Sequence, residues 1–316
     1  MYHRVTDKIF DPRQLCVSRA HFEEHMQVIK KYGRIVQMRE MGMNLKRFPF
    51  GSNEIVVTLD DGYADNFRNA RPILERHEIP ATFFVVTGSI GRHEDFWWND
   101  LEASILAPRI LPDLFESTIA GIKYTWKIAP EGPCHIMDYS QSTNGVPQDG
   151  ITLSRSKLYY VLMRLLGAAS LDERRNVLLQ IGAWANQLLA SEPESLPMTS
   201  EEIVSLANSA FFEIGAHTVG HAMLSLLPKE KQEEEISRSK LDLEDMLSRR
   251  IDSFSYPYGK YSDDTVKLVE GIKFQNACTA VQQPVMRNSN PYLLPRFTVT
   301  NWNGDQFEQK VRSWLT

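Results

Sequence analysis

Residues 54–62 read EIVVTLDDG, a short apolar run that ends in two acidic residues and a glycine. A run this short and this rich in β-branched residues predicts a strand buried on both faces, as in a parallel sheet. Residues 81–86, ATFFVV, predict a second such strand. Between them, residues 65–77 have the pattern of a helix in which Pro72 predicts a break or a kink. The order strand, helix, strand indicates an α/β fold.

The same alternation is found upstream of this stretch and again in the last third of the chain. A helix is predicted at 21–31, and Thr199 or Ser200 is a good N-cap for a later one. The other predicted strands are 211–216, 254–256, 276–281 and 293–299, and the other predicted helices are 229–249, 262–270 and 305–315. This pattern favours a barrel of alternating strands and helices. In such barrels the chemistry is assembled at the carboxyl ends of the strands.

Residues 95–198 interrupt the alternation, and we expect them to be an insertion in a barrel formed by residues 1–94 and 199–316. The insertion has three aromatic residues near its start, at 96–98, and contains a stretch rich in turn formers at 132–150. Two helical patterns follow, at 158–166 and 173–189. Excursions of this length are commonly functional. A mostly helical lid, arm or packing subdomain is therefore expected.

The composition is that of an ordinary globular protein. The 316 residues include 35 Lys and Arg against 40 Asp and Glu, which gives a formal net charge of −5, and 42% of them are hydrophobic. These values exclude disorder, collagen and coiled coil as descriptions of the whole chain, and the mild acidity argues against nucleic acid as a partner. The length allows two domains or one large α/β barrel.

Cysteine spacing and hydropathy limit which thiol sites, membrane segments and compartment the sequence predicts. Cys16, Cys134 and Cys278 lie far apart, unlike a thiolate zinc site or a disulfide framework, so free thiols are expected. The chain lacks a run of 18 apolar residues and an apolar signal core, which predicts a cytoplasmic protein without a transmembrane segment. A strand that begins at residue 1 leaves open that a few upstream residues are missing.

Asp60 and Asp61 are the first candidates for chemistry, because they follow a predicted buried strand and precede Gly62. A glycine turn can direct both carboxylates into one site, and a solvated pair in an Asx turn is the alternative. His217 and His221, in the sequence HTVGH, follow another predicted strand. Their spacing of four places both imidazoles on one side of a helical turn, as in many metal sites. Two unrelated surface or capping histidines are the alternative.

These two pairs could project from the same barrel rim. One carboxylate and two imidazoles form a three-ligand site with open positions, which is the layout of catalytic zinc, and the other carboxylate is left as a base. Pro257 and Tyr258, in a third strand end that reads SYPYG, could contact a substrate or an oxyanion, or form a plain turn. Trp97 and Trp98 could stack on a sugar ring, although packing of the insertion is favoured because large aromatic residues dominate cores.

The three strand ends together resemble a known family. TLDDG at 58–62 resembles the TFDDG motif of the polysaccharide deacetylases, carbohydrate esterase family 4. HTVGH at 217–221 resembles their H-[ST]-x-x-H motif, and FSYPYG at 254–259 is similar to their R-x-P-Y-G segment. The resemblance covers residues 1–92 and 199–316. The opening MYHRV looks like the first strand of the branch that modifies exopolysaccharides.

The resemblance implies a deformed (β/α)7 barrel that hydrolyses N-acetyl groups of an acetylated amino sugar, in a polysaccharide or its precursor, with release of acetate. Asp60 would be the general base. Asp61, His217 and His221 would hold a divalent metal, zinc first, with cobalt, nickel, iron or manganese as alternatives. Two other functions stay open: a deacylase of a non-sugar amide on the same fold, and a catalytically weak carbohydrate-binding protein.

Two departures from the family pattern define further candidates. Ser255 replaces the arginine that orients the base, and Arg296, in the sequence LPRF, could supply that guanidinium or be structural. No L-x-H-D sequence occurs near the carboxyl terminus, so the usual general-acid histidine is absent. His3 at the end of the first strand is the expected replacement. His93 or His135 of the insertion is the alternative, and a structural role is open for each histidine.

Overall fold

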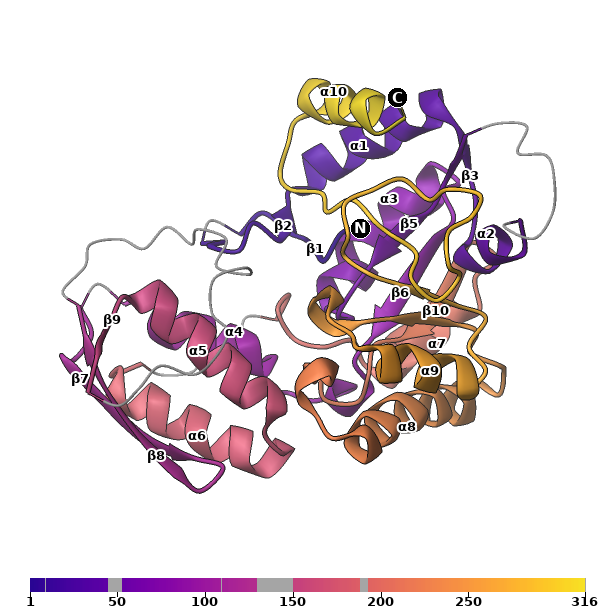
Figure 1. The fold of residues 1–316 in the computed structure, drawn as a ribbon. Helices are drawn as coiled ribbons and strands as arrows, with labels where there is room; N and C mark the ends of the chain where they lie inside the picture. The colour runs from indigo at the N-terminus through magenta and orange to yellow at the C-terminus, as the bar shows by residue number, and fades with distance from the viewer. Residues whose placement is uncertain (9, 45–52, 109, 130–149, 188–192, 316) are drawn as a thin grey trace. The chain divides into compact units, whose positions relative to one another are not determined.

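The structure is a computed structural model that describes residues 1–8, 10–44, 53–108, 110–129, 150–187 and 193–315. It divides the chain into two compact units. Unit 1 comprises Met1–Ile9, Gln14–Arg92 and Pro193–Thr316, and unit 2 comprises Phe10–Arg13 and His93–Glu192. Figure 1 shows the elements of both units along the chain. The described residues form no helix that is long and apolar enough to cross a membrane.

Unit 1 is built on a five-stranded parallel sheet of order β12-β11-β10-β6-β5. The strands are β5 Val57–Leu59, β6 Ala81–Val85, β10 Phe212–Ala216, β11 Ser253–Ser255 and β12 Asn276–Cys278. Every residue of these strands is buried, as expected for a parallel sheet covered on both faces. The predicted α/β fold is thus confirmed.

The amino-terminal segment lies beside β5. Tyr2 donates its N–H to the Thr58 carbonyl at 2.8 Å, and its own carbonyl accepts from the Asp60 N–H at 3.0 Å. This parallel pairing is a single bridge of Tyr2 with β5. It brings the next residue, His3, to the level of Asp60 at the carboxyl end of the sheet.

A carboxyl-terminal segment lies beside β12, at the other edge of the sheet. Leu294 donates its N–H to the Ala277 carbonyl at 2.9 Å and forms one parallel bridge with β12. The predicted strand at 293–299 is therefore wrong as a regular element. Beyond Leu294 the register is lost, because the Arg296 N–H bonds to the Val281 carbonyl at 2.9 Å while the Thr279 carbonyl accepts from the Arg296 side chain. The predicted strand at 276–281 likewise ends early, at Cys278.

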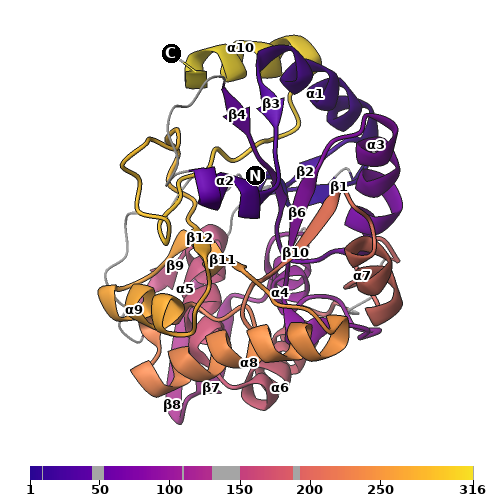
Figure 2. The ribbon, with the colours of Figure 1, turned by 90° about the vertical axis from the view of Figure 1, so that its right-hand side faces the viewer.

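Seven helices of unit 1 surround this sheet among the described residues (Figures 1 and 2). They are α1 Arg19–Tyr32, α2 Met38–Asn44, α3 Arg71–Arg76, α7 Ser200–Ala207, α8 Lys229–Leu247, α9 Asp263–Gly271 and α10 Gly304–Leu315. Thr199 and Ser262 form capping boxes that start α7 and α9. Figure 1 shows α1 and α10 side by side, and Figure 2 shows α8 beside α9.

The helix predicted at 65–77 is interrupted near Pro72, as expected. Asn66–Ala70 form a π-helical turn, and the regular helix α3 begins at Arg71. Pro72 has no N–H to bond back to the preceding turn. The turn before it is wider, since the Arg71 N–H bonds to the Asn66 carbonyl five residues back.

Short elements complete unit 1. Two parallel pairs are β1 Arg4–Val5 with β2 Cys16–Val17, and β3 Arg34–Ile35 with β4 Glu54–Ile55. The run 54–59 predicted as one strand is thus divided into β4 and β5. Among the described residues of this unit, single 3₁₀ turns lie at Thr87–Ser89, Leu224–Leu226 and Pro257–Gly259. Cys16 and Cys278 are free thiols, as predicted, and Cys134 lies outside the described residues.

Unit 2 contains three helices and a three-stranded sheet in its described part. The elements are α4 Trp97–Ile105, β7 Leu114–Ile119, β8 Ile122–Ile128, β9 Thr152–Leu153, α5 Arg155–Ala168 and α6 Leu171–Trp184. The helices predicted at 158–166 and 173–189 correspond to α5 and α6. Of the predicted loop 132–150, only Gly150 is described.

The hairpin of β7 and β8 adds strands to a stretch that was expected to be mostly helical. β7 alternates exposed and buried residues, with Phe115, Ser117 and Ile119 buried. Ala120 and Gly121 connect the strands with positive φ angles of 52° and 75°. A two-residue turn with positive φ at both positions matches the twist of a hairpin.

Candidate active site

Three predicted metal ligands meet at the carboxyl ends of β5 and β10. One ligand atom each of Asp61, His217 and His221 lies within 4.8 Å of the others, and all three residues are buried. The Asp61 Oδ1 atom is 3.4 Å from Nε2 of His217 and 3.3 Å from Nε2 of His221. The carboxylate oxygen and both Nε2 atoms therefore converge on one point.

The opposite ring nitrogen of each histidine already has a partner. Nδ1 of His217 lies 2.7 Å from the Ser255 carbonyl, which can only accept, so Nδ1 donates to it and Nε2 is the atom that faces Asp61. Nδ1 of His221 lies 3.0 Å from the Tyr258 hydroxyl. Metal-binding histidines are usually oriented by such outer partners. The donor set and its orientation thus fit a divalent cation.

The charge state of Asp61 also fits a cation. Burial on its own would raise the pKa of Asp61, but the charge of His221 and the hydrogen bonds of both imidazoles hold it well below its usual range. The carboxyl group is therefore ionised at neutral pH, as a metal ligand must be.

Four residues of this region have left-handed backbone, which is unusual for residues other than glycine. They are Asp61, Thr218, His221 and Tyr258, with φ angles of 76°, 65°, 54° and 58°. Each such residue costs about 1–2 kcal/mol and persists only where the surrounding structure holds it. Two of the four are predicted metal ligands, and a third, Tyr258, contacts one.

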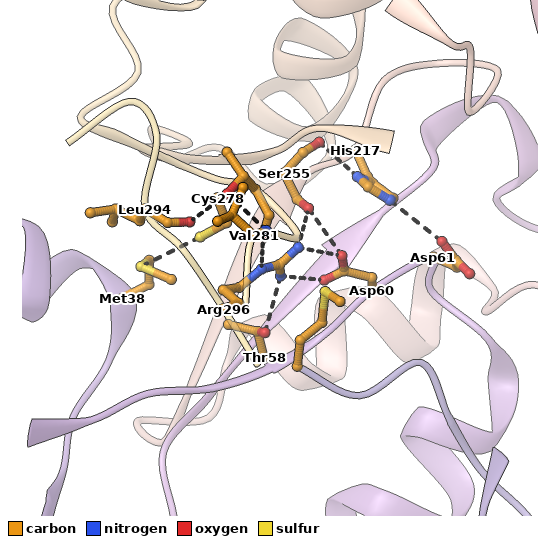
Figure 3. A network of polar contacts seen from close by, with 12 residues as sticks. Met38, Thr58, Asp60, Asp61, His217, Ser255, Cys278, Val281, Leu294 and Arg296 are labelled. Carbon is orange, nitrogen blue, oxygen red and sulfur yellow. Dashed lines mark hydrogen bonds and ion pairs between the residues drawn. The ribbon is translucent and has the colours of Figure 1, made fainter. Parts of the chain in front are cut away.

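Asp60 follows β5, and its carboxylate is turned towards Arg296, whereas that of Asp61 is turned towards His217 (Figure 3). The guanidinium donates to both carboxylate oxygens, at 2.8 and 2.7 Å. It also donates to Thr58 Oγ1 at 3.1 Å, to Ser255 Oγ at 2.8 Å and to the Thr279 carbonyl at 3.0 Å. Such a two-point geometry is the strongest form of an arginine–carboxylate contact. Arg296 is thus the guanidinium that pairs with Asp60 in this structure.

Ser255 connects this ion pair to the histidine cluster. Its hydroxyl donates to Asp60 Oδ2 at 3.0 Å, while its carbonyl accepts from His217. The sequence identifies Ser255 only as a departure from the family pattern. The signal that could have found its role is its place at the end of a buried strand, where the side chain must point into the site.

The ionisation of Asp60 reflects two opposing effects. Asp60 and Arg296 are only 3% and 8% exposed, and burial of the carboxyl group raises its pKa. The charge and hydrogen bonds of Arg296, with smaller contributions from His217 and His3, outweigh burial and lower the pKa of Asp60 to about 2. Asp60 is therefore a carboxylate that can accept a proton at neutral pH.

His3 lies near both carboxylates. Its charge contributes to the low pKa of Asp60 and to that of Asp61. Its carbonyl accepts from the Asn66 side chain at 2.9 Å. His93 is an exposed residue of unit 2, and His135 lies outside the described residues.

The predicted sugar-contacting aromatic residues take part in local packing. Trp98 is fully buried and stacks on Phe96 at 4.5 Å between ring centroids. The Arg174 guanidinium lies 4.6 Å from the centroid of Trp97. In unit 1, Pro257 is buried, and the half-buried Tyr258 has its ring 4.5 Å from that of His221.

The fold and the site together define a class: α/β proteins with an Asp-His-His metal cluster and a separate, ionised carboxylate at the carboxyl ends of parallel strands. Three protein ligands with open positions are typical of catalytic metal sites in hydrolases. The chain belongs to the polysaccharide deacetylase family, whose model matches residues 48–118 and 177–277. The resemblance seen in the three motifs is thereby confirmed.

Individual relatives agree with this assignment. The chain is 19% identical over 326 residues to the poly-β-1,6-N-acetyl-D-glucosamine N-deacetylase of Staphylococcus aureus (strain MRSA252), covering 99% of this chain and 81% of that protein. The structure of IcaB from Ammonifex degensii matches with a TM-score of 0.60 at 18% identity, covering 99% and 94% of the two chains. Streptococcus pyogenes deacetylase PplD in complex with acetate matches with a TM-score of 0.58 at 16% identity, covering 98% and 95%. These structures support the fold.

Proposed function

We propose that this protein is a metal-dependent hydrolase that removes N-acetyl groups from an amino sugar in a polysaccharide or its precursor and releases acetate. The observation that carries the proposal is the ionised Asp60, held by Arg296 beside the cluster of Asp61, His217 and His221. A polymer of N-acetylglucosamine is the substrate named for the staphylococcal relative. We extend that substrate class to this chain.

We also propose that unit 1 is the deformed (β/α)7 barrel implied by the resemblance. The segments at Tyr2 and Leu294 extend the sheet at its two edges. Val299 donates its N–H to the Met1 carbonyl at 3.0 Å, which supports closure of the seven segments into a ring. Residues 95–198 would then be an insertion between two barrel segments, as a lid, an arm or a packing subdomain.

Asp61, His217 and His221 would hold the metal, with zinc as the first candidate and cobalt, nickel, iron and manganese also suited to an Asp-His-His set. When bound, a divalent cation polarises an acyl carbonyl and lowers the pKa of its bound water towards about 7. This assistance matters here because a carboxylate with the low pKa of Asp60 is a weak base towards ordinary water. Asp60 would accept the proton of the attacking water, while Arg296 keeps the carboxylate ionised and oriented.

The remaining groups would serve the substrate. The backbone N–H of Tyr258 is proposed to donate to the oxyanion, a contact worth about 3 kcal/mol in other hydrolases. Pro257 and Trp97 stay predictions as sugar contacts, whereas Trp98 is fully buried and stacks on Phe96, which supports the packing role that the sequence favoured. His3 is proposed as the general acid that protonates the leaving amine, which its place near both carboxylates supports.

Replacement of His3 tests the general acid. His3→Gln is expected to slow release of acetate from an N-acetyl amine by roughly 10²- to 10⁴-fold, the usual contribution of acid–base assistance. Hydrolysis of 4-nitrophenyl acetate should change much less, because its leaving group departs without a proton. His93→Gln tests the alternative acid, and we expect it to leave both rates unchanged. Equal losses on both substrates would show that His3 does not act as the acid.

The proposed function is tested by acetate release from an acetylated glucosamine oligomer before and after chelation. We expect activity that disappears with the metal and returns on addition of one equivalent of zinc. Bound zinc without acetate release would favour a non-sugar amide as substrate. Glycan binding without bound metal and without acetate release would favour the weak carbohydrate-binding protein.

A further inference from the structure

The loop that joins the two histidines is held from outside by Glu235. This residue belongs to α8, and its Oε2 atom accepts from the N–H of Val219 at 2.9 Å and of Gly220 at 2.8 Å. The loop needs such support because Thr218 and His221 both have left-handed backbone. One carboxylate oxygen thus fixes the two peptide groups that lie between the strained positions.

The carbonyl side of the same loop is held by a second segment. Thr87 donates its N–H to the Thr218 carbonyl at 3.1 Å, and Gly88 donates to the Val219 carbonyl at 2.8 Å. A Cβ atom at Gly88 would lie 2.6 Å from that carbonyl oxygen, so only glycine allows this approach. The loop is therefore clamped between the backbone of Thr87 and Gly88 and the carboxylate of Glu235.

Helix α8 is anchored in the core and therefore holds this carboxylate in a fixed position. Ile236, the residue next to Glu235, is fully buried, and so is Leu243 two turns later. Asp242 on the same helix accepts from the Thr87 hydroxyl at 3.2 Å, which ties α8 to the second segment of the clamp. Hydrogen bonds from N–H groups to an ionised carboxylate are about twice as strong as neutral ones.

We infer that Glu235 is a positioning residue for the metal centre. By fixing the loop, its carboxylate keeps Nε2 of His217 and of His221 turned towards Asp61, and so raises the affinity for the metal. Without the clamp, His221 would be correctly placed for only part of the time, and the apparent dissociation constant would rise in inverse proportion to that fraction. The inference rests on the proposed metal centre.

The affinity for zinc tests this role directly. Outer partners of metal ligands typically contribute about 10- to 100-fold in affinity. Glu235→Ala should raise the zinc dissociation constant by about that factor, and Glu235→Gln by less, because its amide oxygen can still accept. Glu234→Gln is the matched control: the neighbouring Glu234 is exposed and pairs with Lys231 at 2.7 Å. Its dissociation constant should equal that of the wild type.

The measurement is competition with a chromophoric chelator at 25 °C, together with thermal unfolding of each metal-free protein. A general loss of stability lowers the unfolding temperature but leaves the dissociation constant of the folded protein unchanged. Wild-type affinity in Glu235→Ala, or an equal loss in Glu234→Gln, would overturn the role of Glu235. A wild-type protein that binds no zinc would overturn the metal centre itself, and the role of Glu235 with it.

Discussion

Asp60→Asn is expected to keep one equivalent of bound metal and to lower the rate of acetate release by about 10³-fold, within the usual range of acid–base assistance. The amide has nearly the shape of the carboxylate but cannot take a proton from water. Asp60 is not among the clustered ligands, which are Asp61, His217 and His221. In the same sample, the rate of acetate release should therefore fall while the metal content stays at one equivalent.

His217→Ala is the contrasting variant for this experiment. It removes a ligand, so metal and activity should be lost together. If Asp60→Asn also lost its metal, Asp60 would be a ligand and not the base. Full activity in Asp60→Asn, or full metal content and activity in His217→Ala, would show that the assignment of the site is wrong.

Arg296→Met is expected to lower the free energy of unfolding at neutral pH by about 3–5 kcal/mol, the usual cost of leaving one member of a buried ion pair alone. Asp60 would stay buried without its counter-charge, and burial, which raises the pKa of Asp60, would no longer be opposed by the guanidinium. Urea denaturation of the metal-free protein, followed by circular dichroism, measures the loss.

The double variant Asp60→Asn/Arg296→Met separates this ion pair from simple loss of packing. Removing both charges leaves no unpaired ion, so the double variant should be clearly more stable than Arg296→Met alone. If the two proteins unfolded at the same urea concentration, the bidentate contact between Asp60 and Arg296 would contribute no coupling free energy to the stability of the protein. The comparison also remains useful if the single variant folds poorly.

The parts of the site that are local in sequence can be predicted from the sequence. Asp60 and His217 each follow a short apolar run, and those runs form β5 and β10. The reason is physical: a strand buried on both faces needs an uninterrupted apolar run, and the turn after it carries the polar residues. The spacing of His217 and His221 is equally local.

The hairpin of unit 2 could not be recognised in the same way. Leu114 and Ile122 are apolar and yet 45% and 56% exposed, which hides the alternation of buried and exposed residues. The turn at Ala120 and Gly121 also lacks the Asn-Gly or Asp-Gly pair that marks such hairpins. Packing within unit 2 decides which apolar residues are buried, and sequence periodicity alone does not contain that information.

Contacts between distant parts of the chain were the least predictable. Arg296 is a candidate only because the family arginine is missing, and its partner Asp60 is 236 positions away. Glu235 is the last of three consecutive glutamates, and its neighbours Glu233 and Glu234 are exposed. Glu235 differs from these neighbours only in the folded protein, where the orientation of α8 about its axis turns it towards the histidine loop.

The left-handed residues of the site limit how far this protein can be stabilised by redesign. Glycine at Asp61, Thr218, His221 or Tyr258 would relieve a backbone cost of about 1–2 kcal/mol at each position. At Asp61 and His221 the same change would delete a proposed ligand, and at Tyr258 the partner of one. A procedure that scores backbone energy alone would select these substitutions first and yield a more robust protein that we expect to be inactive. Libraries built for thermal tolerance should therefore keep these four positions fixed.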